Sequence, residues 1–215
     1  RMLKTTEARK LTGFFTSDFS RVGQSSAKEI IRLAKFSDAV IPKNIDGPKV
    51  EKLFQAIQQV HLMKPPLDCL SPLREKLIEE GLRKQLNPEY VVSITRTPDV
   101  YRGNPFEIEV GLAYGGELPQ DSVATLYRFA NRVPLMYQAG DCALAKAVSE
   151  IEWRRYGLEQ ASSASLPTGP IAIFVHIVSV WVPFTSESKE AIASYPEIIK
   201  EVKLALQEVS RQLSV

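Results

Sequence analysis

The stretch "PIAIFVHIVSVWVPF", Pro170–Phe184, is the longest apolar run in this chain of 215 residues. It is shorter than the roughly 20 residues that a membrane-spanning helix needs. Its apolar residues fall on both faces of an extended chain, which is typical of a strand in the middle of a sheet. We therefore predict a central strand over Pro170–Val180, in which His176 is a packed residue rather than a ligand or a catalytic base.

A loop with the sequence "TSESKEA" follows this strand. It carries Lys189 among small hydroxyl residues and carboxylates. Two interpretations are open from the residues alone. Lys189 is either an ordinary surface lysine at the start of a helix or a point charge directed at a phosphate that another domain presents.

A long helix is expected after the loop. Ser194 and Glu197 have the spacing of a capping box, and Pro196 suits the first turn. A heptad-like seam then predicts the inward face: Tyr195, Ile199, Val202, Leu206, Val209 and Leu213. The helix is either a well-packed core element or a lever that reaches another subunit.

Three β-rich segments precede the apolar strand, at Tyr90–Arg96, Phe106–Gly116 and Ser122–Ala130. In the second segment, apolar residues alternate with Glu107 and Glu109, which predicts one buried and one solvated face. A further helix is expected to begin at Asp141. Together these patterns predict an α+β domain over Asn87–Val215, with a four-stranded sheet, helices on one face and a long C-terminal helix.

The part before it, Arg1–Leu86, shows helical patterns and no strand signal, so we predict a small all-α domain. Ser26 and Glu29 have capping-box spacing, and Pro48 suits the start of a further helix. Ser71 is the expected N-cap of the last helix. The expected inward positions are Ala27, Ile30, Ile31 and Ala34, then Val50, Leu53, Phe54, Ile57 and Val60, then Leu73, Leu77 and Ile78.

The net charge of +2 hides an asymmetry between these two parts. Arg1–Leu86 has 16 Lys and Arg against 10 Asp and Glu, and Asn87–Val215 has 11 against 15. A net charge of +6 makes the first part more compatible with a polyanion. Chance variation over solvated surfaces is the alternative explanation.

The chain contains few residues that would form a catalytic or metal-binding site by themselves. Two cysteines, 73 positions apart, and two histidines do not make a zinc site, so no metal is expected. No phosphate-binding glycine motif is present. No signal peptide and no transmembrane segment is visible, so we expect a cytoplasmic protein without a membrane partner. Any chemistry is expected to be shared with another domain.

The helices around Gly23 resemble the helix-two-turn-helix module, through "FSRVGQSSAKEIIRLAKF" followed by "VEKLFQAIQQV". That module occurs in a ribosomal protein, in formamidopyrimidine-type DNA glycosylases and in one group of topoisomerases. Helix N-termini offer free amides to phosphate. The candidate DNA-contacting residues are Arg21, Lys28, Arg32 and Lys35. The alternative is that the module is only a spacer.

A wider resemblance covers essentially the whole chain. The strings "DCLSPLREKLIEEGL" (Asp68–Leu82), "FANRVPLMYQAGDCALAKAV" (Phe129–Val148) and Gly169–Leu213 resemble the B subunits of archaeal type IIB DNA topoisomerases, the topoisomerase VI family. The resemblance implies a helix-two-turn-helix domain followed by a transducer domain. It also implies an enzyme that passes one DNA duplex through another with ATP and Mg²⁺. Its partners would be double-stranded DNA and the DNA-cleaving A subunit, in an A2B2 heterotetramer.

The same resemblance gives Lys189 a role. It implies that Lys189 is the switch lysine, a catalytic and ATP-binding residue that reaches into the subunit's own N-terminal GHKL-type ATPase domain and contacts the γ-phosphate. The Asn–Asp box and glycine-rich lid of that ATPase domain are missing here. We therefore expect this chain by itself to be inactive, without bound cofactor.

Two other functions compete with this one. A stand-alone nucleic-acid binding protein could combine the same two folds, but "TSESKEAI" and the long last helix would have no purpose in it. A small-molecule kinase would need a glycine-rich phosphate loop, which is absent.

Overall fold

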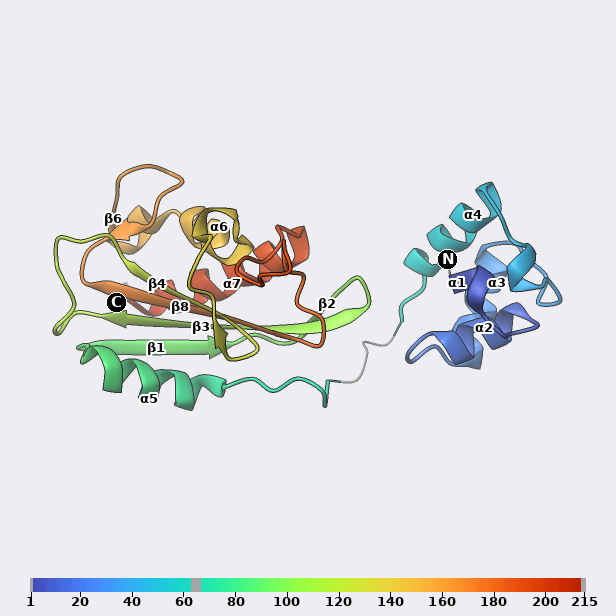
Figure 1. Cartoon of the computed structure of the whole chain (residues 1–215), viewed down its shortest axis with the longest axis horizontal. Coiled ribbons are helices and arrows are strands. Elements are labelled where there is room, and N and C mark those ends of the chain that lie inside the picture. Colours follow the sequence, from blue (N-terminus) through green and yellow to red (C-terminus); the bar gives the residue numbers. More distant parts are fainter. Residues whose placement is uncertain (1, 63–66, 214–215) are drawn as a thin grey trace. The chain divides into compact units, whose positions relative to one another are not determined.

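The computed structural model describes residues 2–62 and 67–213. The chain divides into two compact units, Arg1–Pro66 and Leu67–Val215, and both can be followed in Figure 1. The predicted division at Leu86 is therefore too late. Helix α5 (Arg74–Leu86), which the sequence places in the first domain, packs on β1 and β3 of the second unit.

The first unit is all-α, as predicted. It contains α1 (Met2–Thr5), α2 (Leu11–Asp18), α3 (Gln24–Leu33), a 3₁₀ turn (Pro42–Asn44) and α4 (Pro48–Gln59). Ala27, Ile30, Ile31 and Ala34 of the predicted apolar stripe are buried with residues from α2 and α4. Helix α3 begins after Gly23, so Ser26 is not its N-cap.

Two predicted core positions of α4 are exposed instead. Leu53 and Ala56 define its buried face, whereas the side chains of Val50 and Phe54 are 39% and 55% exposed. On α5, Leu77 is likewise 54% exposed, and the helix begins after Leu73 rather than at Ser71. On both helices, apolar residues extend beyond the side of the helix that packs against the core.

The second unit is built on a mixed sheet of six strands, not the predicted four, because two short strands, Asp99–Tyr101 and Val133–Pro134, extend it. The strands are β1 (Tyr90–Thr95), β2 (Asp99–Tyr101), β3 (Asn104–Tyr114), β4 (Thr125–Ala130), β5 (Val133–Pro134) and β8 (Ile171–Ser179). Their order is β1-β3-β8-β4-β5, with β2 paired to β3. Only β4 and β8 are parallel among these pairs. The prediction of a central strand is confirmed, because β8 lies between β3 and β4 and all its residues are buried.

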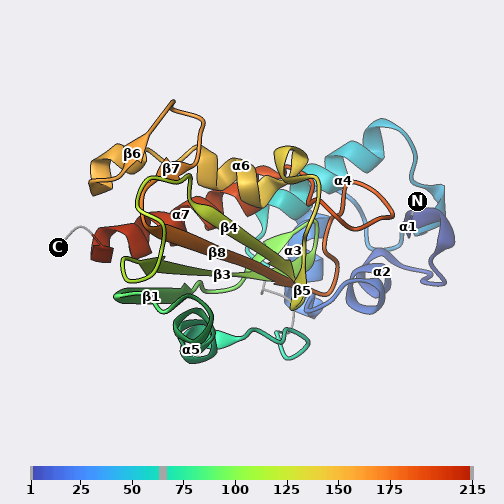
Figure 2. The ribbon, with the colours of Figure 1, turned by 60° about the vertical axis from the view of Figure 1, so that its left-hand side comes forward.

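Helices lie on both faces of this sheet, and the prediction of a single covered face is wrong. Figure 2 shows α5 on one side and α6 (Ala143–Ser149) with α7 (Pro196–Leu213) on the other. Two further short elements, the 3₁₀ turns Ala139–Asp141 and Trp153–Tyr156, flank α6. A separate two-stranded ladder pairs β6 (Glu159–Gln160) with β7 (Pro167–Thr168).

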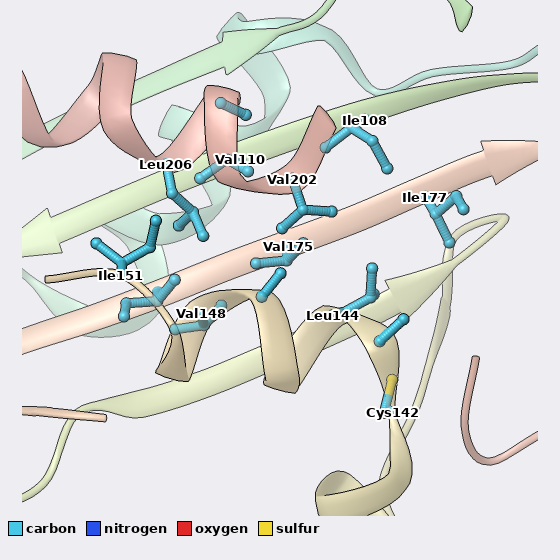
Figure 3. Packing of buried hydrophobic residues seen from close by; sticks show 14 of the residues in the cluster. Ile108, Val110, Cys142, Leu144, Val148, Ile151, Val175, Ile177, Val202 and Leu206 are labelled. Atoms are coloured by element: carbon cyan, nitrogen blue, oxygen red, sulfur yellow. The ribbon is translucent and has the colours of Figure 1, made fainter. Parts of the chain in front are cut away.

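The main core fills the space between the sheet and the pair α6 and α7. In Figure 3, Val110 of β3 and Val175 of β8 point toward Leu144 of α6 and Val202 of α7. Helix α7 begins at Pro196, which therefore lies in its first turn as predicted, whereas Ser194, the expected cap, lies two residues before the helix. Of its predicted seam, Val202, Leu206 and Val209 are fully buried, and Tyr195, Ile199 and Leu213 are partly buried against the same core.

The opposite face of β3 is also covered. Glu107 and Glu109 are 3% and 0% exposed, so the expected solvated face does not exist. It is covered by the N-terminal end of α5, whose backbone amides and Arg74 side chain satisfy the two carboxylates. No helix within residues 2–62 and 67–213 is long and apolar enough to cross a membrane.

Candidate functional site: the Lys189 loop and its groove

Lys189 lies on a loop that leaves the end of the central strand β8 and returns toward α7. The two sides of the loop pair at its base, where Phe184 bridges Ile192. The Thr185 amide donates to the Ala191 carbonyl (2.9 Å), and the Ala193 amide donates to the Pro183 carbonyl (2.8 Å). These bonds close the loop, so Lys189 is carried on a defined projection.

The base of the loop is anchored in the main core. Ala191 and Ile192 are fully buried, and the carbonyl of Ile192 accepts a hydrogen bond from the amide of Ala143 in α6 (2.8 Å). The tip is exposed from Thr185 to Lys189. Lys189 itself has a φ of +57°, and its amide donates to the Ser186 carbonyl (3.2 Å). A fixed base and an exposed tip suit a side chain that contacts something outside this unit.

A groove of about 820 Å³ opens beside the loop. Lys189, Arg102, Asn131, Trp181 and Tyr195 are among the residues that line it. The indole of Trp181 is 68% exposed. Within the described part of the chain, the side chains of Lys189 and Arg102 form no ion pair with a carboxylate. Two cations without carboxylate partners make the groove suitable for an anionic group, although Glu187 also lines it.

Arg102 is held by aromatic rings rather than by a carboxylate. Its guanidinium lies 4.9 Å from the ring centroid of Tyr195 and 5.6 Å from that of Tyr101. Burial raises the pKa of Tyr101 to about 12, and its hydrogen bond with Tyr195 acts in the same direction. The phenol is therefore neutral at ordinary pH, so the full charge of Arg102 remains available.

A second cluster of polar side chains lies where β8, β3 and the start of α5 meet. His176 Nδ1 is 2.8 Å from Glu109 Oε2, and His176 Nε2 accepts the amide of Arg132 (2.9 Å). Because an accepting nitrogen carries no proton, the ring proton lies on Nδ1 and is donated to Glu109. This supports the prediction that His176 is a packed residue, and its role is to orient Glu109.

Burial alone would raise the pKa of Glu109, but neighbouring hydrogen-bond donors counteract it. The largest of these effects is the hydrogen bond from His176, followed by the amides of Leu73 (2.9 Å) and Arg74 (2.7 Å). Together they hold the pKa of this carboxyl below its ordinary value. Burial raises the pKa of Glu107, and its ion pair with Arg74 offsets that rise only in part.

The basic residues predicted to contact DNA are all on the surface of the first unit. Arg21, Lys28, Arg32 and Lys35 are exposed. Lys28 and Arg32 are one turn apart on α3, outside its buried stripe, and Lys35 follows the end of the helix. The helix therefore presents one apolar side and one polar side, which carries Glu29 as well as the two basic residues. Among the described residues, no group of three or more His, Cys, Asp or Glu side chains could hold a metal ion.

Sequence reasoning missed Arg102, Asn131 and Trp181 as neighbours of Lys189. The dipeptide Arg102-Gly103 was a usable sequence signal for a tight turn. In the structure both residues have positive φ in a two-residue hairpin turn between β2 and β3. Nothing in the sequence brings that turn to Lys189, since the contact depends on how β3 pairs with β8.

Comparison with known proteins gives a consistent result over the whole chain. Residues 65–215 match the family model described as "Topoisomerase VI B subunit, transducer". The chain is 47% identical over 214 residues to the B subunit of type 2 DNA topoisomerase 6 from Methanococcoides burtonii, covering 100% of this chain and 34% of that protein. It is 47% identical to the same subunit from Archaeoglobus fulgidus, covering 99% of this chain and 35% of that protein.

The chain thus spans about a third of the length of these relatives. A solved structure of the DNA gyrase B-subunit from Myxococcus xanthus matches 64% of this chain and 38% of its own, with 16% identity and a TM-score of 0.40, which is too remote to bear on function. The matched family segment coincides with the unit that contains the β8 strand, the Lys189 loop and α7. The relatives do not support a stand-alone nucleic-acid binding protein, and the chain belongs to the family of topoisomerase VI B subunits, of which it contains the transducer domain.

Proposed function

We propose that this chain is part of the ATPase subunit of a type IIB DNA topoisomerase and relays ATP binding and hydrolysis to the DNA-cleaving A subunit. The observation that carries the proposal is the position of Lys189. It lies on a closed loop between the central strand β8 and the long helix α7, with no carboxylate partner among the described residues.

The residues of this chain fit one contact with a nucleotide rather than a complete pocket. Bound ATP with Mg²⁺ would be held by an N-terminal ATPase domain of the same subunit, and Lys189 would reach its γ-phosphate. An ammonium ion suits this role, because it is a compact charge with three donors on a flexible stem. The ATP chemistry belongs to that domain, so this chain by itself is expected to be inactive.

The connections of the loop explain how such a contact is relayed. A short segment after Ala191 connects the base of the loop to Pro196, the first residue of α7. Helix α7 packs along β3 and β1, and its core face is buried from Ile198 to Val209. A contact made at Lys189 and lost on hydrolysis would therefore shift a packed helix and strand together. The long helix then acts as a lever toward the A subunit.

Lys189→Ala in the complete B subunit tests this role. We expect ATP turnover to fall roughly 10- to 100-fold, because a hydrogen bond to a charged group is worth about 1.5–3 kcal/mol. Strand passage should fall with it, while the midpoint of urea unfolding stays unchanged. Lys200→Ala, which removes an exposed lysine from α7, is the matched control. Unchanged ATPase and relaxation activity in Lys189→Ala would show that Lys189 is an ordinary surface residue.

The first unit is proposed to be a helix-two-turn-helix module that contacts double-stranded DNA through phosphates. What supports this is the exposed basic side of α3 with Lys28 and Arg32, flanked by Arg21 and Lys35. Contacts of this kind position a protein on DNA without reading its sequence. Because the relatives are named as one subunit of a topoisomerase, a partner subunit is expected, and we propose an A2B2 heterotetramer in the cytoplasm.

Replacing Arg21, Lys28 and Arg32 with Gln tests the DNA contact. We expect weaker binding to duplex DNA and a salt dependence whose slope falls by about 0.9 for each lost phosphate contact. The matched control is the triple change of Lys43, Lys49 and Lys52 to Gln, which removes the same charge from other exposed positions of the first unit. Equal losses in both triple variants would mean that only the net charge of the first unit matters, and unchanged DNA binding would mean that the module is a spacer.

A further inference from the structure

The turn between β4 and β5 consists of Asn131 and Arg132. Ala130 pairs with Val133, so the two residues form a two-residue hairpin loop. Their φ angles are +46° and +67°, as a type I′ turn requires at both positions. Each side chain contacts a different segment of the second unit, and the two segments are far apart in the sequence, one before α5 and one at the end of β8.

Asn131 holds the end of β8. Its Nδ2 donates to the carbonyl of Ser179 (2.9 Å), and its Oδ1 accepts the amide of the same residue (3.0 Å). The backbone amide of Asn131 donates to the carbonyl of Ile177 (2.9 Å). The side chain therefore continues the β4–β8 ladder by one more pair, in the way that a further strand residue would.

Ser179 is the point at which the Lys189 loop leaves the sheet. It is the last residue of β8 and pairs on its other side with Phe106 of β3. Its hydroxyl donates to the carbonyl of Pro105 (2.9 Å) and accepts the amide of Trp181 (3.2 Å). The hydrogen-bonded base of the loop, which we call its neck, begins shortly afterwards, at Pro183. Asn131 thus fixes the origin of the loop.

Arg132 holds the segment that enters α5. Its Nε and one terminal nitrogen donate to the carbonyls of Ser71 (3.2 Å) and Pro72 (3.0 Å). Its backbone amide donates to His176, which in turn donates to Glu109, the acceptor for the first amides of α5. The turn is therefore tied to the entry segment Leu67–Leu73 both directly and through the buried cluster.

We propose that the Asn131–Arg132 turn is a positioning element for Lys189, which holds the origin of the Lys189 loop and the entry segment of α5 in one arrangement. A displacement of the loop at Ser179 would then reach the entry segment, the part of the second unit that directly follows the first unit in the chain. This inference rests on the proposed role of Lys189 for its effect on ATP turnover. Its structural part, that the turn fixes the loop, is independent of that role.

Asn131→Gly and Arg132→Gly in the complete B subunit test the structural part, because glycine keeps the positive φ and removes only the side-chain contacts. Hydrogen exchange is measured on the amides of the loop neck, Thr185 and Ala193. We expect roughly 10-fold faster exchange there in both variants, since the lost hydrogen bonds stabilise the closed neck. Gln138→Gly, at an exposed residue with a φ of +52°, is the matched control.

Two results would overturn the structural part. Unchanged exchange of the neck in Asn131→Gly would show that the clamp on Ser179 does not hold the loop. Faster exchange that stays confined to the entry segment in Arg132→Gly would show that the turn does not couple the two segments. Neither measurement uses ATP, so both remain decisive if Lys189→Ala proves to have normal ATPase activity.

The functional part is tested by ATP turnover in Asn131→Gly, Lys189→Ala and the double variant. We expect Asn131→Gly to lower kcat roughly 3- to 10-fold and the double variant to be no slower than Lys189→Ala alone. Such non-additivity is the signature of a residue that acts through another. Independent losses that multiply in the double variant would show that Asn131 does not act through Lys189.

Discussion

At the scale of single residues, Glu109 joins the strands β1 and β8 to the start of α5. Its carboxylate is fully buried and accepts hydrogen bonds from His176, Thr95 and the first amides of α5. A carboxylate at a helix N-terminus is stabilised both by these amides and by the helix dipole. The result is a charged group that fixes where α5 begins on the sheet.

This arrangement predicts a pH dependence of stability. The folded-state pKa of Glu109 is below its ordinary value, so its contribution is present above an unfolded-state pKa of about 4.3 and is lost as the pH falls through the lowered value. Glu107 acts in the opposite direction, because its raised pKa removes stability as the pH rises from that ordinary value through the raised one.

Glu109→Gln should therefore lower the free energy of unfolding at pH 7 by about 1–3 kcal/mol and flatten the acid limb of the stability profile. Urea unfolding at pH 7 and pH 4 measures it. Both tryptophans lie in the second unit, so their fluorescence reports this unit alone. Glu107→Gln is the control, with a smaller loss at pH 7. Equal losses in the two variants would contradict a special role for Glu109.

At the scale of elements, the packing of α5 on β3 depends on one small residue. A Cβ atom at Gly111 would lie 2.8 Å from side-chain atoms of both Ile78 and Leu82, which are the buried residues of α5. Such a distance is too short for two carbon atoms, so one side chain or the helix would have to move. Glycine at this position of β3 lets the helix approach the sheet.

Two Gly→Ala changes are expected to have opposite effects. Gly111→Ala should lower the free energy of unfolding by about 1–3 kcal/mol through overpacking. Gly81→Ala, on the exposed side of α5 with no atom within 4 Å of the added Cβ, should raise it by about 0.5–1 kcal/mol, because alanine suits a helix interior better than glycine. Urea unfolding curves measure both. A stabilising Gly111→Ala would refute the close approach of α5.

At the scale of the whole molecule, the division into units places α5 with the sheet. The matched family segment begins at residue 65, and the second compact unit begins at Leu67. Removing α5 would expose Val91, Ala113 and Phe174, which pack against it. It would also remove the hydrogen-bond donors that α5 and its first residues supply to the carboxylates of Glu107 and Glu109.

Two truncated chains distinguish the observed division from the one that the sequence predicted. A chain that begins at Leu67 should unfold cooperatively, as followed by tryptophan fluorescence, because its core is complete. A chain that begins at Asn87 should be unstable or aggregate, because the apolar side chains of Val91, Ala113 and Phe174 would be exposed to water. If both chains are equally stable, α5 is not part of the second unit.

The sequence determined the elements whose pattern is read along a single segment. The continuous apolar run predicted β8, and the heptad-like seam with Pro196 predicted α7. The stripe from Ala27 to Ala34 predicted the buried side of α3. These succeed because burial on one side, or on both, imposes a period that propensity and spacing reveal directly.

The role proposed for Lys189 comes from the resemblance and not from a pattern, because one lysine on a loop has no periodicity. The structure then supplied its surroundings, with Arg102, Asn131 and Trp181 in the same groove. Arg102 lies in the turn between β2 and β3, Asn131 lies in the turn between β4 and β5, and Trp181 lies in the chain that follows β8. Their proximity depends on the pairing of β8 with both β3 and β4, which no local pattern contains.

The absence of tertiary information from a local pattern also explains why the predicted solvated face of β3 was wrong. Alternation of apolar residues with Glu107, Glu109 and Gly111 showed that the two faces of the strand differ, but not what lies on the polar one. The sequence by itself therefore determined which segments are strands and helices and which family they resemble. Only the tertiary structure decided that α5 covers the acidic face, because its N-terminal amides, Arg74 and His176 supply the hydrogen bonds that make burial of two carboxylates possible.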